Sequence, residues 1–517
     1  MQRKSQLRFA VLVGGFLLSA MAQAADYYVA TTGNDANAGT SGAPFLTLGH
    51  AIGVAAAGDT IHIGAGNFNE TNTVSKPLHL VGAGPGTVVT SALSANQGVF
   101  NLDSGASGSS MRMLRLQVPV TNYAYGIYVT DASTVNGLTL DQVLIDGGSS
   151  GGTVTAGFGA RSGRVTGLRV ADSAFRNLYH GVIQQHINPC NAADRGMLSD
   201  VRMTRVIFSD NAEKGLYAEG LSDALFDEVQ VLRNGAPSAG GPNVTSSANG
   251  AGFDINLKGA SYQNIVIRNS IFTQNGVGTR NGAAIMVKAR DDRSYTCAPA
   301  SLTGVTIENN QITDNERGVR FGEPMNINVA PGTLAYNAGP VNVLVRYNTI
   351  TGNVPSYSDP GGAPADAFGA VIDHTLSPSI AVNRNNLSGN GLAPNDQNGI
   401  LNPHYAAFVS GNNTVDGRCN WWGAANGPRN SLTASALLTH NPQTPTPQAT
   451  GTGDMVGSDI TYLPFLMSSN LRGPCAELLP WETTPALAPV PADSPWALLL
   501  ATLGVLAAFA GWRRRQA

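Results

Sequence analysis

Apolar positions recur with one spacing along the middle of this sequence, and that spacing is found nine times. If the first residue of each unit is position 0, then positions 0, 2 and 7 are apolar and position 10 is often Asn. Apolar residues at every second position are typical of a strand, and the phase break before position 7 indicates a turn rather than a helix. The units begin at Met111, Leu138, Leu168, Val201, Ala224, Ile265, Val305, Val343 and Ile380.

The spacing between the units varies, although the pattern inside them does not. Successive starts lie 27, 30, 33, 23, 41, 40, 38 and 37 residues apart, so loops of different lengths follow a constant core. A leucine-rich horseshoe would need its own Leu and Asn spacing, and a propeller would need four strands in each unit. We therefore predict a solenoid in which each coil holds three short strands and stacking buries the inward row of every coil.

Asparagine recurs at two positions of the unit. At position 10 it occurs as Asn211, Asn234, Asn275, Asn315, Asn353 and Asn390, and at position 5 of three consecutive units as Asn310, Asn348 and Asn385. Asn tolerates the left-handed backbone conformation of a bend, and its amide can bond the same amide one coil away. We interpret these residues as structural ladders.

Two further stretches, one toward each end of the repeats, agree with such a solenoid. The N-terminal stretch includes YYVATTGND at residues 27–35 and GDTI at residues 58–61, with a short capping helix expected over residues 47–57. The C-terminal stretch includes NWWG at residues 420–423 and YLPFL at residues 462–466.

With these stretches, residues 26–470 resemble the right-handed parallel β-helix repeat family, which has a pectin-lyase-like fold. The resemblance implies an all-β protein made of a single right-handed parallel β-helix, with three-strand coils and an N-terminal helical cap. It says little about activity, because one fold hosts many functions.

The N-terminus has the parts of a secretory signal peptide. Arg3, Lys4 and Arg8 precede an apolar run at residues 9–18, and small residues follow at the cleavage spacing, which predicts a cut near Ala24 or Ala25. A transmembrane anchor is the weaker interpretation, because the apolar run is too short to span a bilayer.

The C-terminus has the parts of a sorting signal. A Pro-rich linker precedes an apolar run at residues 497–512, and three arginines follow at residues 513–515. This order resembles the IPTL-CTERM and PEP-CTERM families of bacterial sorting signals. The resemblance implies that a sortase-like membrane enzyme cuts near the Pro-containing motif and passes the protein onward to the surface. A plain membrane anchor is the alternative.

These features together predict the organisation of the chain and its destination. The expected segments are a signal peptide at 1–25, the cap and first coils at 26–110, the repeats at 111–400, the terminal coils at 401–475, the linker at 476–494 and the tail at 495–517. We expect secretion to the outer surface or the medium of a Gram-negative bacterium. Contact with the membrane is expected only through the tail, as a transient inner-membrane anchor.

Four cysteines become disulfide candidates if the chain is exported. Three pairings are possible. We favour Cys419 with Cys475, which bracket one terminal segment, and Cys190 with Cys297, which lie in two loops of the body. Zinc binding is the lesser interpretation, because no two cysteines have the close spacing of zinc sites.

Composition narrows the classes of partner. Hydrophobic residues make up 42% of the chain, enough for a sizeable core, while 61 glycines and 13% charged residues indicate turn-rich β structure. The net charge of −3 and the lack of a long basic run within the body argue against nucleic acid as a partner.

The strand that follows each Asn bend carries two sets of side chains. One set is apolar and is predicted to face the core: Ile127, Val129, Leu216, Ala218, Phe253, Ile255, Ile285, Val287, Val319 and Phe321. The other set is predicted to face outward and is rich in polar, charged and aromatic residues. Because neighbouring coils lie ~4.8 Å apart, the outward side chains should form one continuous patch.

This outward patch is the candidate functional site. Lys or Arg can hold a uronate carboxylate or act as a base, and paired carboxylates can serve as acid, base or nucleophile in sugar chemistry. The candidate catalytic residues are Glu219, Asp254, Lys258, Lys288 and Arg290, and the candidate substrate-binding residues are Tyr128, Tyr217, Asn256 and Arg320. His180, His186 and His374 are expected near the same face.

Two functions fit such a patch, and a third interpretation gives the patch no function. The protein is predicted to be a surface protein with a carbohydrate-binding, adhesive or structural role; the alternative is a polysaccharide lyase or glycoside hydrolase that acts on an acidic polysaccharide. Either function implies a polysaccharide or cell-surface glycan as partner. The third interpretation is a solvated face whose opposite charges pair across coils. No cofactor is predicted, although a single calcium ion at Asp254 stays open.

We predict that export and sorting remove both ends of the chain. The intact mass of surface-released protein should then match a polypeptide that lacks both Met1 and Arg515. Finding the Arg-rich end on the surface form would contradict the sorting signal.

Overall fold

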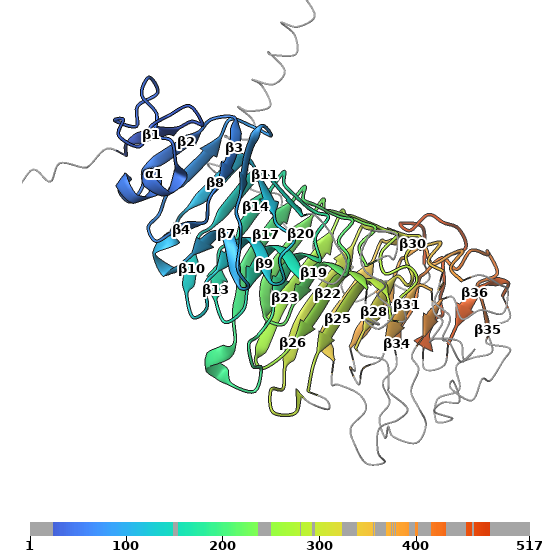
Figure 1. Cartoon of the computed structure of the whole chain (residues 1–517). Helices are drawn as coiled ribbons and strands as arrows, with labels where there is room; N and C mark the ends of the chain where they lie inside the picture. Colours follow the sequence, from blue (N-terminus) through green and yellow to red (C-terminus); the bar gives the residue numbers. More distant parts are fainter. Residues whose placement is uncertain are drawn as a thin grey trace, which may run out of the picture.

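The chain forms an elongated solenoid of stacked coils, with the N-terminal cap at one end (Figure 1). The computed structural model describes residues 24–147, 154–235, 250–279, 281–291, 295–322, 339–354, 356, 369–373, 375, 377, 379–391, 399–401, 415–430, 451–457 and 460–475. Its strands pair in parallel from one coil to the next. The predicted all-β parallel β-helix is therefore confirmed.

Within the described residues the strands belong to two long sheets. The larger sheet contains β1 (Asp26–Val29), β2 (Thr60–Ile63), β3 (Gly66–Asn69), β5 (His79–Gly82), β6 (Thr87–Thr90), β8 (Ser110–Val118), β10 (Thr134–Asn136), β11 (Thr139–Gly147), β13 (Arg164–Thr166), β14 (Arg169–Ala171), β15 (Ala174–Arg176), β17 (Met197–Thr204), β18 (Ile207–Ser209), β20 (Leu221–Asp227), β21 (Gln230–Leu232), β23 (Ser261–Arg268), β24 (Ile271–Thr273), β26 (Ser301–Glu308), β27 (Gln311–Thr313), β29 (Pro340–Arg346), β30 (Thr349–Thr351), β32 (Ile380–Asn383), β34 (Val415–Asp416) and β37 (Ile460–Thr461). The second sheet contains β4 (Asn72–Val74), β7 (Gln97–Leu102), β9 (Ala124–Val129), β12 (Thr155–Ala160), β16 (His180–Gln184), β19 (Lys214–Ala218), β22 (Ala251–Leu257), β25 (Ala283–Ala289), β28 (Val319–Phe321), β31 (Val371–Asp373), β33 (Ile400–Leu401), β35 (Pro428–Asn430) and β36 (Gly453–Val456).

Each complete coil has three strands, as predicted. In one coil β20 and β21 belong to the larger sheet and β22 belongs to the second; β23, β24 and β25 repeat this order in the next coil. Val201 pairs with Ala224, Ala224 with Ile265, and Ile265 with Val305, so equal positions of successive units face one another.

The first predicted unit is wrong by two residues. Met111, placed at position 0, pairs with Leu140, which is a position 2 residue, and Leu116 rather than Val118 pairs with Ile145. Met113 has a φ of 56°, so the backbone bends there and the apolar alternation restarts after it.

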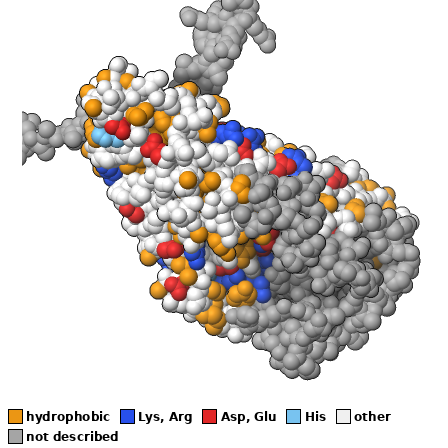
Figure 2. Space-filling model, in the orientation of Figure 1, with side chains coloured by type: hydrophobic (Ala, Val, Ile, Leu, Met, Phe, Trp, Pro, Cys, Tyr) orange, Lys and Arg blue, Asp and Glu red, His pale blue; other side chains and the backbone are white. Residues whose placement is uncertain are grey.

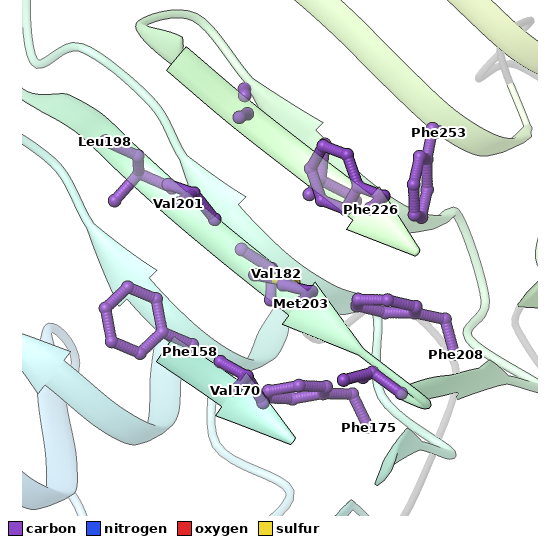
Figure 3. Packing of buried hydrophobic residues seen from close by; sticks show 14 of the residues in the cluster. Phe158, Val170, Phe175, Val182, Leu198, Val201, Met203, Phe208, Phe226 and Phe253 are labelled. Carbon is purple, nitrogen blue, oxygen red and sulfur yellow. The ribbon is translucent and has the colours of Figure 1, made fainter. Parts of the chain in front are cut away.

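The core is a set of columns in which apolar residues at equal positions of successive coils stack, such as Phe208, Val231 and Phe272, and aromatic rings also meet between columns. Phe175 and Phe208 stack with ring centroids 5.4 Å apart, and Phe253 contacts both Phe208 and Phe272 at 5.3 and 5.2 Å. Figure 3 shows part of this packing around Phe158, Phe208 and Phe226. Aromatic pairs at these separations add to the stabilisation that apolar burial provides.

Asparagines form two buried ladders inside the coils. In the ladder of position 10 residues, Asn275 Nδ2 donates to Asn315 Oδ1 and Asn315 Nδ2 to Asn353 Oδ1, both at 2.9 Å. The ladder at position 5 extends through Asn385 to Asn420, whose Oδ1 lies 3.1 Å from Asn385 Nδ2. The predicted amide-to-amide bonding is thus confirmed.

The predicted reason for Asn at the bends is only half right. The left-handed residue is not the ladder asparagine but the residue before it, such as Gln274 before Asn275 and Tyr347 before Asn348. The ladder asparagine points inward because its amide offers both a donor and an acceptor, and that pairing satisfies polar groups that water cannot reach.

A column of glycines lies at the start of the strands in the second sheet. A β-carbon on Gly157 would overlap the carbonyl oxygen of Gly181, and Gly181 and Gly215 are related in the same way. The column consists of Gly126, Gly157, Gly181, Gly215 and Gly252. Part of the high glycine count therefore results from close stacking of coils.

Both ends of the described solenoid are closed by packing. The predicted capping helix is α1 (Leu48–Val54), whose N-terminal amides at Leu48 and Gly49 donate to the Glu70 carboxylate. At the far end Trp422 is buried in the core. None of the helices in the described ranges has the length and apolar character needed to cross a membrane. The expected signal peptide, linker and tail lie outside the described residues, apart from Ala24 and Ala25.

Both predicted disulfides are present. Cys190 is bonded to Cys297 and Cys419 to Cys475. The second disulfide joins the residue before Asn420, the last member of one asparagine ladder, to the end of the described chain.

We predict that Phe272→Ala lowers the free energy of unfolding by about 3 to 5 kcal/mol, because it removes a fully buried ring from a stacked column. The matched control is Ile271→Ala in the same strand, since Ile271 is 37% exposed and should matter far less. Urea unfolding followed by circular dichroism measures both. Equal losses would contradict the assignment of inward and outward positions.

Candidate functional site

The predicted alternation on the third strands is confirmed. Phe253 and Ile255 belong to the main core, and Asp254 and Asn256 lie between them on the opposite side of β22. The outward side of β16, β19, β22, β25 and β28, with the residues flanking them, carries a set of polar and charged side chains, here termed the charged cluster. Its members are His180, Glu213, Lys214, Tyr217, Glu219, Asp254, Asn256, Lys258, Lys288, Arg290 and Arg320.

The charged cluster is buried, which contradicts the interpretation as a solvated face. Its members are at most 8% exposed, apart from the Glu213 side chain at 12%. The sequence pattern gives the side of the sheet but cannot show what shields it. Figure 2 shows Lys, Arg, Asp and Glu side chains close together on the visible face. Burial removes water from these charges, so they need partners within the protein.

One half of the cluster is a chain of ion pairs around Asp254. Lys288 Nζ lies 2.7 Å from Asp254 Oδ1, and Lys214 Nζ lies 3.3 Å from Asp254 Oδ2. Lys214 also contacts Glu213 Oε1 at 3.4 Å, and Glu213 Oε2 lies 3.2 Å from His180 Nε2. Residues from four neighbouring strands thus meet in one network.

The other half of the cluster surrounds Glu219. This carboxylate pairs with Lys258, accepts the Tyr217 hydroxyl at 2.6 Å and accepts the backbone amide of His186 at 2.9 Å. Asn256 Nδ2 donates to the Tyr217 hydroxyl at 3.1 Å. The centroid of the Tyr295 ring lies 4.3 Å from Lys258 Nζ and 4.6 Å from the Arg290 guanidinium carbon, so one aromatic ring contacts two cations.

Two loops that flank this half are tied together. Cys190 lies in the loop after β16 and Cys297 in the loop after β25, so the disulfide joins loops whose strands are three coils apart. Strands β19 and β22 lie between them. In the first loop Arg195 donates to the Gly259 carbonyl, and His186 Nε2 lies 3.1 Å from the Lys258 carbonyl. The loops therefore hold the ends of the strands that carry Glu219 and Lys258.

Two further predicted site residues make other contacts. Arg320 donates to Met286 Sδ at 2.7 Å and to the Asn281 carbonyl at 2.9 Å. Tyr128 stacks on Tyr125 with ring centroids 4.6 Å apart. Tyr128 and Tyr217 occupy the same position in register, but Gly159 and Ile183 occupy it on the two coils between them.

The surroundings of Asp254 do not suit calcium, which takes six to eight oxygen ligands. Both Asp254 oxygens contact lysine ammonium groups. Among the described residues, no group of three or more His, Cys, Asp or Glu side chains could hold a metal ion. The calcium site that the sequence leaves open is therefore not supported at this position.

The network perturbs the titration of several groups. Burial lowers the pKa of His180 to about 4, although Glu213 opposes that shift. Burial alone would raise the pKa of Glu213, but the charge and the hydrogen bond of Lys214 outweigh it and hold that pKa below its usual value. Burial also raises the pKa of the Tyr217 hydroxyl, and the neighbouring Glu219 adds to the rise. At neutral pH the cluster therefore holds a neutral imidazole beside an ionised carboxylate.

Sequence reasoning missed Glu213 and Lys214, and it gave His180 no specific role. The simple alternation fails at the start of β19, because a β-carbon on Gly215 would meet the core residue Phe208 while Leu216 is itself in the core. Two inward positions in succession place Lys214 outward. It pairs in register with His180 on the preceding coil. The sequence did contain a signal for this break in the alternation, because Gly215 directly precedes the predicted inward residues Leu216 and Ala218.

Comparisons with known proteins agree with this fold. The family model described as "Right handed beta helix region" matches residues 191–418. This match and the parallel strand pairing agree on a right-handed parallel β-helix fold. The model described as "Protein of unknown function (DUF1565)" matches residues 31–292, just over half of the chain, and the chain belongs to that family. No curated protein matches the sequence.

Several solved structures are similar at low identity. The lacto-N-biosidase of family GH136 from Eubacterium ramulus has 10% identity over 69% of this chain and 68% of its own, with a TM-score of 0.38. The mannuronan C-5 epimerase AlgE6 A-module from Azotobacter vinelandii has 15% identity over 71% and 90%, with a TM-score of 0.33. The pectin methylesterase PemA from Erwinia chrysanthemi has 13% identity over 57% and 81%, with a TM-score of 0.28. These scores carry no argument about function.

We predict that Lys258→Met costs about 3 to 5 kcal/mol of unfolding free energy, because it leaves the buried Glu219 carboxylate without its ammonium partner. The double variant Lys258→Met/Glu219→Gln should cost less than Lys258→Met alone. Arg205→Met, which breaks an exposed pair with Asp172, is the control and should change little. Urea unfolding of all three decides the order, and a double variant less stable than Lys258→Met alone would contradict the pairing.

Proposed function

We propose that this protein is exported to the bacterial surface and binds an acidic polysaccharide through the charged cluster. The observation that carries the proposal is the concentration of buried charge on one face of four consecutive coils, β16 to β25. A parallel β-helix does not require charge at these positions. Placing it there is costly unless it serves another purpose.

The row that contains Tyr217 illustrates this point. The residues at this position pair in register from one coil to the next, in the order Ile183, Tyr217, Asp254 and Met286. Apolar residues are therefore accepted in this row, and replacing buried ion pairs by packed apolar residues is often neutral or stabilising. Structural need alone does not account for Asp254 and the ammonium groups around it.

The sign of the cluster favours an anionic partner. Within the charged cluster the cations Lys214, Lys258, Lys288, Arg290 and Arg320 outnumber the carboxylates Glu213, Glu219 and Asp254 by five to three, which gives 5 − 3 = +2 with His180 neutral. Cations fixed on a rigid, poorly hydrated surface attract negative charge more strongly than cations in water do. An acidic sugar should therefore bind better than a neutral one.

The geometry favours a polymer over a single small molecule. The cations repeat along the solenoid axis, from Lys214 on β19 to Lys258 at the end of β22 and Lys288 on β25. An extended chain with one carboxylate per sugar can meet several of them at once.

Export and sorting are supported by the terminal sequences rather than by the fold. The charged, apolar and small residues at the N-terminus are those of a signal peptide, and the Pro-rich linker with its apolar, Arg-ended tail is that of a sorting signal. A surface location would bring the charged cluster into contact with extracellular glycans, in keeping with an adhesive role.

We expect Lys288→Ala/Arg290→Ala to weaken binding to polygalacturonate about tenfold or more and to reduce its dependence on salt, because two cations are lost from the site. Asp254 keeps Lys214 as a partner, so the fold should survive. Arg205→Ala/Arg233→Ala is the matched control, since it removes the same charge from exposed pairs on the larger sheet. Isothermal titration calorimetry in low and high salt gives both quantities.

Unchanged affinity of the cluster variant, or equal weakening by the control variant, would place binding elsewhere on the molecule. If the intact protein binds neither polygalacturonate, polymannuronate nor polyglucuronate, the proposed function is wrong.

A further inference from the structure

Glu219 and Lys258 form a buried ion pair in which each charge has the other as its counterpart. Their side chains are 3% and 5% exposed, and the Lys258 ammonium donates to Glu219 Oε1. Asp254, in contrast, contacts two ammonium groups, whereas in the described part of the chain Glu219 contacts one. A carboxylate with a single cationic partner loses its charge when that partner transfers one proton to it.

The backbone holds the two side chains together. Glu219 directly follows β19, and Lys258 directly follows β22, the paired strand of the next coil. The Lys258 amide donates to the Glu219 carbonyl at 2.9 Å. The Tyr262 hydroxyl lies 2.7 Å from the Lys258 carbonyl oxygen and 3.2 Å from the Glu219 carbonyl oxygen. Groups held together in this way react far faster than the same groups free in solution.

Both oxygens of the Glu219 carboxylate accept hydrogen bonds that suit acyl chemistry. Tyr217 Oη donates to Oε1 at 2.6 Å, and the His186 backbone amide donates to Oε2 at 2.9 Å. Burial and the charge of Glu219 raise the pKa of the Tyr217 hydroxyl well above its usual value, so this hydroxyl stays a donor. Fixed donors at a carboxyl group stabilise the negative charge that develops when a nucleophile attacks it.

Burial favours a product without charge. Each partner of a buried ion pair has lost its hydration, and replacing such a pair by neutral groups is often neutral or stabilising. An amide that joins Lys258 to Glu219 keeps one donor and one acceptor but carries no charge. Its oxygen can still accept from the His186 amide.

We infer that Lys258 and Glu219 form an intramolecular isopeptide bond that joins two neighbouring coils. The Lys258 ammonium passes one proton to Glu219 Oε1, and the neutral amine attacks Cδ, so the Nζ–Cδ bond forms. The negative charge develops on Oε2, next to the His186 amide. Nζ then gives a second proton to Oε1, the Cδ–Oε1 bond breaks and water leaves. The third proton stays on the amide nitrogen, and no other reactant is needed.

This cross-link goes beyond the proposed function and does not depend on it. It removes one positive and one negative charge from the charged cluster, so the excess of cations that favours an acidic polysaccharide is unchanged. A protein that binds no polysaccharide would still contain the cross-link, and a protein without the cross-link could still bind. The two failures are therefore distinguishable.

Peptide mapping of the intact, folded protein tests the bond. The protein is denatured, reduced, alkylated and digested with a protease that cuts only after lysine. Without the bond, cutting after Lys214, Lys258 and Lys288 gives peptides 215–258 and 259–288. With it, Lys258 has no free ammonium for the protease to recognise. The expected product is then peptide 215–288 with the mass of one water missing, and fragmentation places the link between residues 219 and 258.

Lys258→Arg is the matched control for the map. Arginine keeps the cation but does not attack a carboxyl group, and it is not cut by this protease. The variant should therefore give peptide 215–288 at its full mass. Incomplete digestion of the intact protein would also leave that full mass. Loss of water from an aspartate would leave Lys258 open to cutting, so neither process imitates the cross-link.

Tyr217→Phe tests the donor at Oε1. Its loss should slow bond formation after folding by about 10² to 10³-fold, the usual effect of removing one such donor. The control is Tyr128→Phe, which lies on the same sheet, is buried against Tyr125 and should cross-link like the intact protein. The fraction of peptide 215–288 that lacks one water is measured over time in both variants.

The map of the intact protein decides the inference even where a variant does not fold. Complete cutting at Lys258, with both linear peptides at full mass, would overturn it. A link between Lys288 and Asp254 instead would overturn the assignment of the bond. Equal rates of bond formation in the two tyrosine variants would overturn the role given to Tyr217.

Discussion

The whole molecule depends on the contact between a residue and its counterpart one coil away. Parallel pairing fixes that register, so whatever stands at a position must tolerate a similar residue directly above and below it. Phenylalanine, asparagine and glycine meet this condition in different ways: rings stack, amides donate and accept, and the absence of a side chain allows close approach. Asparagine and glycine each form a column of their own, whereas phenylalanine shares its column with other apolar residues such as Val231 and Ile312.

Charged residues cannot meet that condition alone, because like charges in opposite positions repel. On the outward face, cations lie beside carboxylates or an aromatic ring instead of beside other cations. Lys214 contacts carboxylates on both its own strand segment and the next coil, and Tyr295 places an aromatic ring against both Lys258 and Arg290. The charged cluster is therefore an irregular network within a regular fold. Irregularity of this kind is what a specific binding site requires, since a strictly repeating surface would offer no unique position.

Much of the fold could be predicted from the sequence, because repetition multiplies a weak signal. The starts from Val201 to Ile380, the capping helix and both disulfides follow from spacing, resemblance and cysteine placement. The site could be predicted only in part. Alternation assigned Asp254 and Lys288 to one side of the sheet, but the broken alternation at Gly215 hid Lys214 and its neighbour Glu213. Burial could not be predicted at all, since it depends on what packs over a face rather than on the strand itself.

The disulfide between Cys419 and Cys475 has a mechanical consequence. Any pull on the chain beyond residue 475 passes through the sulfur bridge to Cys419, so the covalent path bypasses the residues between the two cysteines. Cys419 directly precedes Asn420, which is hydrogen-bonded to Asn385 and, through it, to the ladder running back along the solenoid. Tension applied at that end would thus reach the stacked coils at Cys419 and Asn420, where backbone pairing and the buried amides both resist it. The terminal residues would then not be peeled away one by one.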